Sequence, residues 1–287
     1  MALSFTQLHS DFAAECSELD LRSVYEEETL EQIRNGMDRY VVLVFRNQNL
    51  SGEDQMAFAK RLDGELQTVN NPVQRQSRLG NDSLIDISNL DSDGEIRDPE
   101  DRKRLYSLAN RLWHTDSSFI DPSGRYSMLY AIDVPSVAAD TQYVDTRAAY
   151  DRLDPEVQAG LQDLRAHHSI AHSRKTLGFE FTQQEEDELA GVIQPLIRTN
   201  PETGRKSLYL ASHISRVIGL PVPEGRLLVW ELIEQATRPP HIYTHKWNVG
   251  DFVIWDNRAT MHRGVAYDDR TYRRELRRVT SLDIPPT

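Results

Sequence analysis

Apolar side chains recur at helical and strand spacings along the chain and predict its elements. Residues 26–39 carry apolar positions three or four apart, which indicates an amphipathic helix. The β-branched run at 40–45 that follows is typical of a buried strand. A second helix is expected after Ser51, a favourable N-cap residue. Residues 8–25 are acidic and show no usable period, so this segment is expected to be irregular.

Short apolar runs bounded by turn residues make up most of the remaining chain. The expected strands are residues 84–88, 126–134, 140–145, 196–199, 207–210, 242–247, 251–255 and the segments that continue through 283. The expected helices are 146–152, 155–164 and 223–237. This pattern predicts a mainly β fold with helices, a double-stranded β-helix (jelly roll) decorated by helices. A βαβαβ Rossmann pattern and a glycine-rich phosphate loop are both missing. Residues 1–287 are expected to form a single domain.

Two polar segments interrupt this pattern. Residues 91–104 are highly charged and contain Gly94 and Pro99, which predicts an exposed loop. Because a metal-binding motif follows it, this loop is expected to reach over the mouth of an active site. Residues from about 170 to 192 are polar and then acidic, which indicates a surface insert.

Charge and composition narrow the class of protein. The chain is 39% hydrophobic and 27% charged, an ordinary soluble composition. Its 45 acidic and 33 basic residues give a formal charge of −12, which argues against nucleic acid or an anionic membrane as a partner. Cys16 is the only cysteine, so an intrachain disulfide and a multi-thiolate metal site are excluded. The sequence shows neither a signal peptide nor a membrane-spanning run, and the expected location is the cytoplasm.

Two separated motifs carry the residue types of a metal site. His114 and Asp116 lie in the sequence Trp-His-Thr-Asp-Ser-Ser-Phe at 113–119. In an extended segment, side chains at i and i+2 face the same way, so this imidazole and this carboxylate would point to one place. His262, which follows a turn and opens a predicted strand, would be the third ligand. Two histidines and one carboxylate that leave coordination positions open are typical of non-haem Fe(II) that activates oxygen.

The motif at 113–119 is weak evidence by itself, because a His-x-Asp triplet also fits a surface strand or turn. The flanking Trp113 and Phe119 would pack beside the ligands, and Asn110 and Asp256 are candidates to support them by hydrogen bonds. Seven further histidines compete with His262 for the third position. They are His9, His167, His168, His172, His213, His241 and His245.

A cluster of arginines follows the third candidate ligand. Arg274 and Arg278 are four residues apart and would share one face of a strand. A solvated basic strand edge is the ordinary interpretation of such a cluster. Arginine also binds carboxylates through its planar fork, so two arginines beside an iron site could hold one carboxylate of a co-substrate and one of a substrate. Thr141 could add a hydroxyl donor to the first of these.

These motifs, taken in order, resemble the Fe(II)/2-oxoglutarate-dependent dioxygenases of the taurine dioxygenase group. The similarity extends from about residue 10 to 283 and includes Val-Leu-Val-Phe-Arg at 42–46 and Trp-Asn-Val-Gly-Asp at 247–251. Within the group, the chain is most similar to members that act on aryloxyacetates such as 2,4-dichlorophenoxyacetate. The motifs that carry the resemblance are His114-x-Asp116, Thr141, His262 and Arg-Arg-x-x-x-Arg-x-Thr at 273–280.

The resemblance implies a fold, cofactors and a role for each matching residue. It implies that His114, Asp116 and His262 hold Fe(II), the metal at which O2 reacts. Thr141 and Arg274 would bind the distal carboxylate of 2-oxoglutarate. The reaction that it implies is hydroxylation of an aryloxyacetate next to the ether oxygen, which gives a phenol and glyoxylate together with succinate and CO2, a step of aromatic catabolism.

The resemblance also implies how an anionic small-molecule substrate is bound. Arg278 would pair with the substrate carboxylate, and His213 would approach the ether oxygen, although a purely structural histidine fits this position equally well. Asn71 stands where a lysine near the substrate is expected, so substrate preference is expected to differ. A homo-oligomer is implied as well.

Two other functions fit the same residues. The same chemistry could act on taurine or on another small sulfonate or carboxylate, since an arginine serves any of these anions. A non-catalytic module that binds a small acid is the alternative outside enzymes, and the complete set of iron ligands argues against it.

Overall fold

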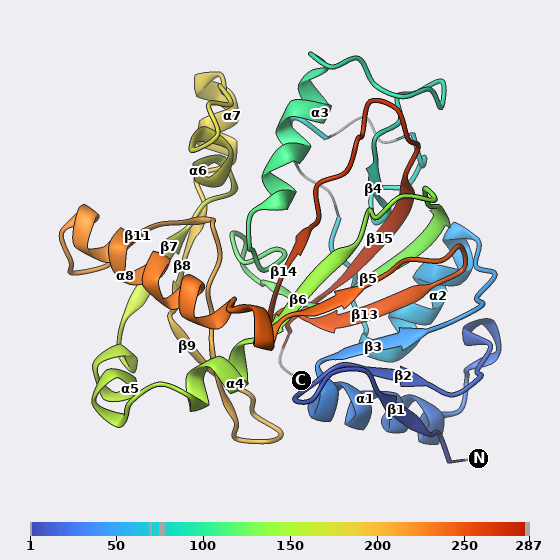
Figure 1. Cartoon of the computed structure of the whole chain (residues 1–287), viewed down its shortest axis with the longest axis horizontal. Helices are drawn as coiled ribbons and strands as arrows, with labels where there is room; N and C mark the ends of the chain where they lie inside the picture. The colour runs from blue at the N-terminus through green and yellow to red at the C-terminus, as the bar shows by residue number, and fades with distance from the viewer. Residues whose placement is uncertain (1, 69–70, 75–77, 285–287) are drawn as a thin grey trace.

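The computed structural model describes residues 2–68, 71–74 and 78–284, and it consists of β-sheets with helices packed around them (Figure 1). Neighbouring strands of the largest sheet are antiparallel except for its parallel second and third strands. Within the described residues this sheet has seven strands, in the order β1 (Phe5–Gln7), β2 (Ala14–Cys16), β3 (Val42–Phe45), β13 (Phe252–Asp256), β5 (Gly124–Asp133), β15 (Glu275–Leu282) and β4 (Ile85–Ser88).

A smaller sheet faces the large one across the core. In the described part of the chain it contains β12 (Tyr243–His245), β6 (Thr141–Asp145) and β14 (Thr260–Gly264), in that order. Leu129 and Trp255 of the large sheet and Tyr143 of the small sheet belong to one buried apolar cluster. The two sheets are the halves of a jelly roll, as the strand pattern predicted.

Two amphipathic helices, α1 (Glu27–Tyr40) and α2 (Gly52–Asp63), cover the outer face of the large sheet. Alternation along β3 explains this arrangement, because successive strand residues face opposite sides of a sheet. Leu43 and Phe45 belong to the cluster beneath the helices, whereas Val42 and Val44 belong to the cluster between the sheets.

A second group of elements lies beside the jelly roll, at the left of Figure 1. Its own apolar cluster includes Val217 of β11 and Val229 and Leu232 of α8. Its strands are β7 (Arg165–His168), β8 (Val192–Pro195), β9 (Ile197–Thr199), β10 (Lys206–Leu208) and β11 (Ile214–Val217). Its helices are α4 (Thr146–Asp151), α5 (Pro155–Leu161), α6 (Ile170–Lys175), α7 (Gln183–Glu188), α8 (Val222–Ala236) and the 3-10 turn η3 (Pro239–His241).

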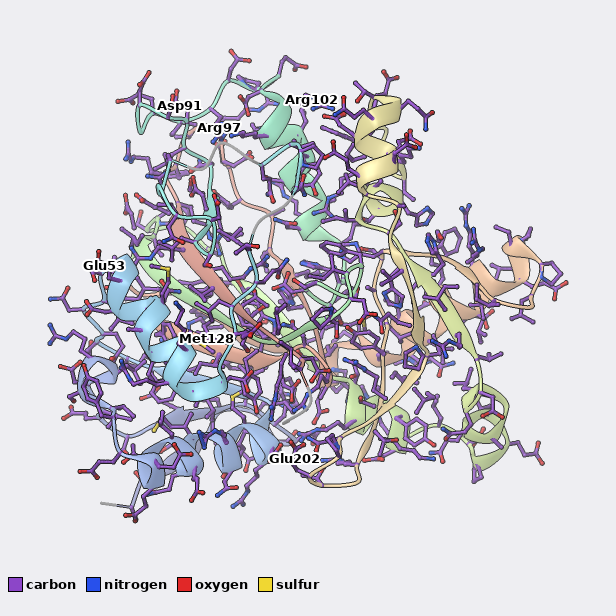
Figure 2. All side chains as sticks on the ribbon, turned by 180° about the vertical axis from the view of Figure 1, so that it is seen from behind. Glu53, Asp91, Arg97, Arg102, Met128 and Glu202 are labelled. Atoms are coloured by element: carbon purple, nitrogen blue, oxygen red, sulfur yellow. The ribbon has the colours of Figure 1, made fainter. Side chains whose placement is uncertain are left out.

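The charged segment at 91–104 leads into a short helix. Its last three residues belong to α3 (Arg102–Ser107), and Arg104 is buried there, where an exposed loop was expected. The 3-10 turn η2 (Leu108–Arg111) follows directly before the metal-binding motif. Figure 2 shows Asp91, Arg97 and Arg102 along the upper rim of the molecule, whereas Met128 lies inside it. The Asp101 side chain accepts a hydrogen bond from the backbone N–H of Arg104 and so caps α3.

The long periodic elements agree with prediction, including the cap of α2, where Ser51 and Asp54 form a capping box. The differences lie in polar segments. Residues 8–25 contain β2 and the 3-10 turn η1 (Leu21–Ser23), where an irregular segment was expected. The polar stretch near 170–192 contains α6 and α7, which are capped by Ser169 and Thr182. No helix in the described part of the chain is both long and apolar enough to cross a bilayer.

Candidate active site

Backbone pairing brings the two histidine ligands together. His114 and His262 form an isolated antiparallel bridge, with N···O distances of 3.0 Å and 2.8 Å in its two hydrogen bonds. His262 belongs to β14, which pairs with β6. The residue opposite His262 in this pair is Tyr143. The centres of the two imidazole rings are 4.2 Å apart. A strand far along the chain therefore places the third ligand beside the first.

Asp116 reaches the same place by a different backbone route from the one expected. Only His114 pairs as in a strand, and a turn begins at Asp116, followed by Ser117 with a φ of 56°. One carboxylate oxygen of Asp116 lies 3.8 Å from His114 Nε2 and the other lies 3.7 Å from His262 Nε2. The expected convergence is correct, but a turn produces it rather than the alternation of an extended strand.

The protonation of these three buried groups suits a metal cation. Burial lowers the pKa of His114 and lowers that of His262 well below its ordinary value, so both imidazoles are neutral. Burial acts to raise the pKa of Asp116, but Arg278 foremost and also a hydrogen bond from Ser127 oppose it, and this pKa falls to about 2. His114 Nδ1 lies 2.8 Å from the carbonyl oxygen of Leu112, and an N–H there leaves the Nε2 lone pair toward Asp116.

The geometry also fits a divalent transition metal. The candidate ligand atoms of His114, Asp116 and His262 lie within 4.8 Å of one another on three buried residues. The separations of 3.7 Å and 3.8 Å are too long for hydrogen bonds, yet two metal–ligand bonds of about 2.0–2.2 Å can span them. Two imidazoles and one carboxylate leave further coordination positions for other ligands, which is the donor set of non-haem iron.

The Asp116 carboxylate is held on several sides. Ser127 donates to Oδ2 at 2.9 Å, and Asn257 donates to the Ser127 hydroxyl at 3.0 Å. Arg278 donates from Nη1 to Oδ1 at 2.5 Å. Ser127 and Asn257 could not be predicted from the sequence, because neither lies in a recognisable spacing to the ligands. β5 and the turn before β14 bring them to this carboxylate only in the folded chain.

A first cavity opens on one side of this centre. Arg274 lies in it with Thr141, whose hydroxyl oxygen is 3.5 Å from Arg274 Nη2 and accepts a hydrogen bond from Trp247 Nε1 at 3.0 Å. Burial lowers the pKa of Arg274, and no carboxylate among the described residues forms an ion pair with it. The first cavity is lined by residues that include Asn89, Leu129, Thr141, Trp255, Tyr267 and Arg274.

A second cavity opens on the other side and has more aromatic and apolar walls. His213 lies in it, with its ring 5.2 Å from that of Phe119 and 5.6 Å from that of His114. Asn110, His114 and Arg278 line both cavities, so the two meet at the candidate metal centre. The second cavity is lined by residues that include Asn71, Tyr106, Phe119, Ile170, Arg174 and His213.

The other residues singled out in the sequence have varied positions. Asn71 lines the second cavity, and its amide donates to the Tyr106 hydroxyl at 2.6 Å. Asn110 Oδ1 accepts a hydrogen bond from Arg174, so Asn110 supports the cavity wall rather than a ligand. The Asp256 carboxylate pairs with Arg258 at 2.8 Å, and within the described residues it forms no hydrogen bond or ion pair with the three ligand residues, so it does not have the expected supporting role.

Comparison with known proteins agrees with this geometry. Residues 4–280 match the model of the family described as taurine catabolism dioxygenase TauD, TfdA family. The chain belongs to this family. It is therefore an α-ketoglutarate-dependent dioxygenase, an oxidoreductase that uses Fe(II), 2-oxoglutarate and O2. Membership of this family of enzymes favours the dioxygenase over the alternative of a non-catalytic module that binds a small acid.

Several members of the TauD, TfdA family are similar over most or all of the chain. The α-ketoglutarate-dependent 2,4-dichlorophenoxyacetate dioxygenase of Cupriavidus pinatubonensis is 45% identical over 287 residues, which cover 99% of each chain. The (S)-phenoxypropionate/α-ketoglutarate dioxygenase of Sphingobium herbicidovorans is 35% identical and covers 80% of this chain and 78% of its own. The crystal structure of AAD-2 in complex with Mn(II) and N-oxalylglycine is 41% identical, covers both chains fully and has a TM-score of 0.93.

Proposed function

We propose that this dioxygenase oxidises an aryloxyacetate similar to 2,4-dichlorophenoxyacetate. The observation that carries the proposal is the meeting of two cavities at one centre, with Arg278 and His114 in the walls of both. A co-substrate and a substrate can then approach the metal from two sides. The similarity to enzymes named for 2,4-dichlorophenoxyacetate and (S)-phenoxypropionate supports this substrate class.

Within this proposal, the three converging residues hold the iron and the first cavity holds the co-substrate. His114, Asp116 and His262 are the iron ligands. Thr141 and Arg274 bind the distal carboxylate of 2-oxoglutarate, because their hydroxyl and guanidinium groups lie side by side in the first cavity. The absence of a carboxylate partner for Arg274 among the described residues supports this role, since a buried guanidinium favours an anion.

The second cavity holds the substrate. Arg278 faces it while it binds Asp116, so its role includes orienting the iron ligand as well as attracting the substrate carboxylate. His213 lies near His114 and Phe119, where it can contact the ether oxygen. Asn71 contributes a neutral amide in place of the expected lysine, and its tie to Tyr106 makes it part of the cavity wall.

The reaction needs positioning more than it needs acid–base groups from the chain. The bound iron, with 2-oxoglutarate and oxygen, supplies the oxidation of the substrate C–H bond, and 2-oxoglutarate becomes succinate and CO2. The arginines direct the carbon between the ether oxygen and the carboxylate toward the open side of the three ligands. Trp255 and Leu129 exclude water from the first cavity. Hydroxylation at this carbon gives a hemiacetal, which breaks into a phenol and glyoxylate.

A product assay tests this function. The enzyme is loaded with Fe(II) and 2-oxoglutarate without oxygen, and oxygen is then admitted with a panel of aryloxyacetates and with taurine. We expect phenol in equal amount to succinate for the aryloxyacetates. Succinate that rises with taurine or another acid, without phenol, would instead support the same chemistry on another small sulfonate or carboxylate. An Asn71→Lys variant, which introduces the lysine expected at this position, should change the ranking of the substrates.

We also propose that the enzyme forms a homo-oligomer and that it is located in the cytoplasm. Val222, Leu227 and Trp230 expose apolar side chains on α8, which supports an interface between copies. Cys16 is buried and burial raises its pKa to about 11, which fits a thiol that plays no redox role. Light scattering of the wild type and of a Trp230→Glu variant tests the oligomer, and a monomeric wild type would contradict it.

A further inference from the structure

Arg174 is a buried cation in the wall of the second cavity. It lies on α6, and only 4% of the residue is exposed. Its Nη1 donates to the Ser173 hydroxyl at 2.8 Å and its Nη2 donates to Asn110 Oδ1 at 3.0 Å. Its guanidinium carbon is 4.6 Å from the centre of the Tyr106 ring. Each of these partners is neutral, and Nε is buried without a hydrogen-bond partner in the described structure.

Three other buried arginines of this chain are neutralised, whereas Arg274, like Arg174, faces a cavity without a carboxylate partner among the described residues. The carboxylate partners of the three are within 3.0 Å, in the pairs Arg104–Asp269, Arg147–Asp145 and Arg258–Asp256. Across the residues that the structure describes, no carboxylate forms an ion pair with Arg174. A buried charge without an opposite charge destabilises the folded state, and burial already lowers the pKa of Arg174. The charge of Arg174 is therefore better explained by a ligand than by the fold.

Arg278, the second arginine of this cavity, does not supply the same free charge. It is bonded to Asp116, whose ionised carboxylate balances it. Arg278 comes from β15 and Arg174 from α6, which lie on either side of α3 in Figure 1. Asp116 and Glu188 also line the cavity, but Glu188 is exposed at its edge. The uncompensated positive charge thus lies on the α6 wall.

We propose that Arg174 determines the specificity of the second cavity for organic anions by attracting and orienting the anionic group of the substrate. This inference rests on the proposed function and deepens it by assigning a second arginine to the substrate. Apolar residues of the same cavity, Phe119, Ile170 and Leu189, can contact the uncharged part of such a molecule. Asn71 strengthens the assignment, because a neutral amide at that position leaves the anion to the arginines.

The test compares acids with neutral molecules of nearly the same shape. Phenoxyacetate and phenylacetate are paired with 2-phenoxyethanol and 2-phenylethanol, and their affinities are measured by calorimetry without oxygen on enzyme loaded with Mn(II) and 2-oxoglutarate. We expect the wild type to prefer the acids. Arg174→Gln, which removes the charge and keeps an amide donor, should lower this preference about 10- to 100-fold. Arg174→Lys, which keeps the charge, should lower it much less.

Two controls separate specificity from structure. Lys175→Gln removes the same charge from the next residue, which lies outside the cavity in an exposed ion pair with Glu186, and should leave the preference unchanged. The affinity of Arg174→Gln for 2-oxoglutarate should equal that of the wild type. Circular dichroism verifies that each variant folds. Arg174→Met is a second variant without the charge, for comparison with Arg174→Gln.

Several outcomes would overturn the assignment of Arg174. Equal loss of acid and alcohol binding in Arg174→Gln would show a structural role, and so would failure of both uncharged variants to fold. A wild type without preference for either acid would also refute it. Failure of the proposed function is distinct: a wild type that prefers acids through Arg174 but releases no phenol keeps the anion site and rejects aryloxyacetate cleavage.

Discussion

At the scale of single residues, Arg278 has two tasks that the sequence motif does not separate. It bonds to Asp116 and helps to lower the pKa of that carboxyl to about 2, and it also lines both cavities. A residue that holds a metal ligand affects metal affinity as well as substrate affinity. Substitution of Arg278 should therefore change both, in contrast to substitution of Arg174, whose hydrogen bonds among the described residues go to Ser173 and Asn110 rather than to a ligand.

Arg278→Gln is the first prediction at this scale. We expect its affinity for Fe(II), measured by anaerobic titration, to fall about 10- to 100-fold, because Asp116 loses its charged partner. The KM for substrate should rise far more than the KM for 2-oxoglutarate. Arg277→Gln is the matched control, since Arg277 lies on the same strand but bonds to Gln55 and to the Leu50 carbonyl. Unchanged iron affinity together with equal effects on both KM values would reject these roles for Arg278.

At the scale of elements, the pairing of β7 with β8 shapes the wall of the second cavity. Gly191, which precedes β8, has a φ of 82°, and a Cβ added there would overlap the carbonyl oxygen of His168. Its backbone therefore requires glycine, both for the positive φ and for the close approach of the neighbouring strand. Gly191 also lines the second cavity, so a shift of this strand pair would move a wall of the proposed substrate site.

Gly191→Ala is the prediction that follows from this strand pair. We expect the free energy of unfolding, measured in urea, to fall by about 1–3 kcal/mol. Substrate affinity should fall as the cavity wall shifts. Gly160→Ala, in α5 with no atom near the added Cβ, should instead stabilise the protein by about 0.5–1 kcal/mol. A Gly191→Ala protein as stable as the wild type would contradict the required glycine.

A buried ion pair links the end of α2 to β5 and β15, and it gives stability a pH dependence. Burial raises the pKa of Asp63 to about 6, against the opposing effects of Arg125 at 3.1 Å and of the Ser281 hydroxyl. The folded protein thus binds this proton more tightly than the unfolded chain does, whose carboxyl has a pKa near 4. The stability that Asp63 contributes is present below about pH 4 and is lost as the pH rises through about 6.

Asp63→Asn tests this linkage, because asparagine does not titrate. The free energy of unfolding of the variant, relative to the wild type, should rise by about 1–3 kcal/mol between pH 4 and pH 7. Urea unfolding at the two pH values measures it. Asp54→Asn should show a trend of the opposite sign, located mainly below pH 4, because hydrogen bonds from Ser51 lower the pKa of Asp54. Parallel pH curves for Asp63→Asn and the wild type would rule out the raised pKa.

At the scale of the whole molecule, the candidate metal site is built from parts of the chain that belong to different sheets. His262 is on β14 of the small sheet, whereas Asp116 is held by Ser127 of β5 in the large sheet. A metal that binds only the folded arrangement stabilises it, and the stabilisation grows with the logarithm of the metal concentration relative to the dissociation constant. A metal held by these residues would therefore also connect the two halves of the jelly roll.

Removal of the metal should accordingly lower the melting temperature. At a metal concentration 100 times the dissociation constant, Mn(II) without oxygen should stabilise the wild type by about 2.7 kcal/mol. Thermal unfolding with and without a chelator measures the difference. His262→Ala should show no metal-dependent stabilisation, whereas His167→Ala should retain it, since His167 bonds to Ser215 outside the centre. A His262→Ala protein that metal stabilises as strongly as the wild type would remove His262 from the ligand set.

Prediction from the sequence succeeded where a local pattern carries the information. The apolar spacing of α1, the N-cap at Ser51 and the apolar run of β13 depend on neighbouring residues, and each element lies close to its expected position. Polar segments were less predictable. α6 and α7 each have six residues, and their caps at Ser169 and Thr182 look like ordinary polar positions when the apolar spacing is weak.

The sequence by itself determined the chemical identity of the centre, because two histidines and a carboxylate in this order specify a donor set whatever backbone presents them. It did not determine how they meet. The bridge between His114 and His262, the turn at Asp116 and the bond from Arg278 arise from pairing between distant segments. The unpaired charge of Arg174 is of the same kind: an arginine on a polar helix is unremarkable until packing buries it without a carboxylate. Only tertiary structure decides which charges remain for a ligand, because burial and partners are properties of the folded chain.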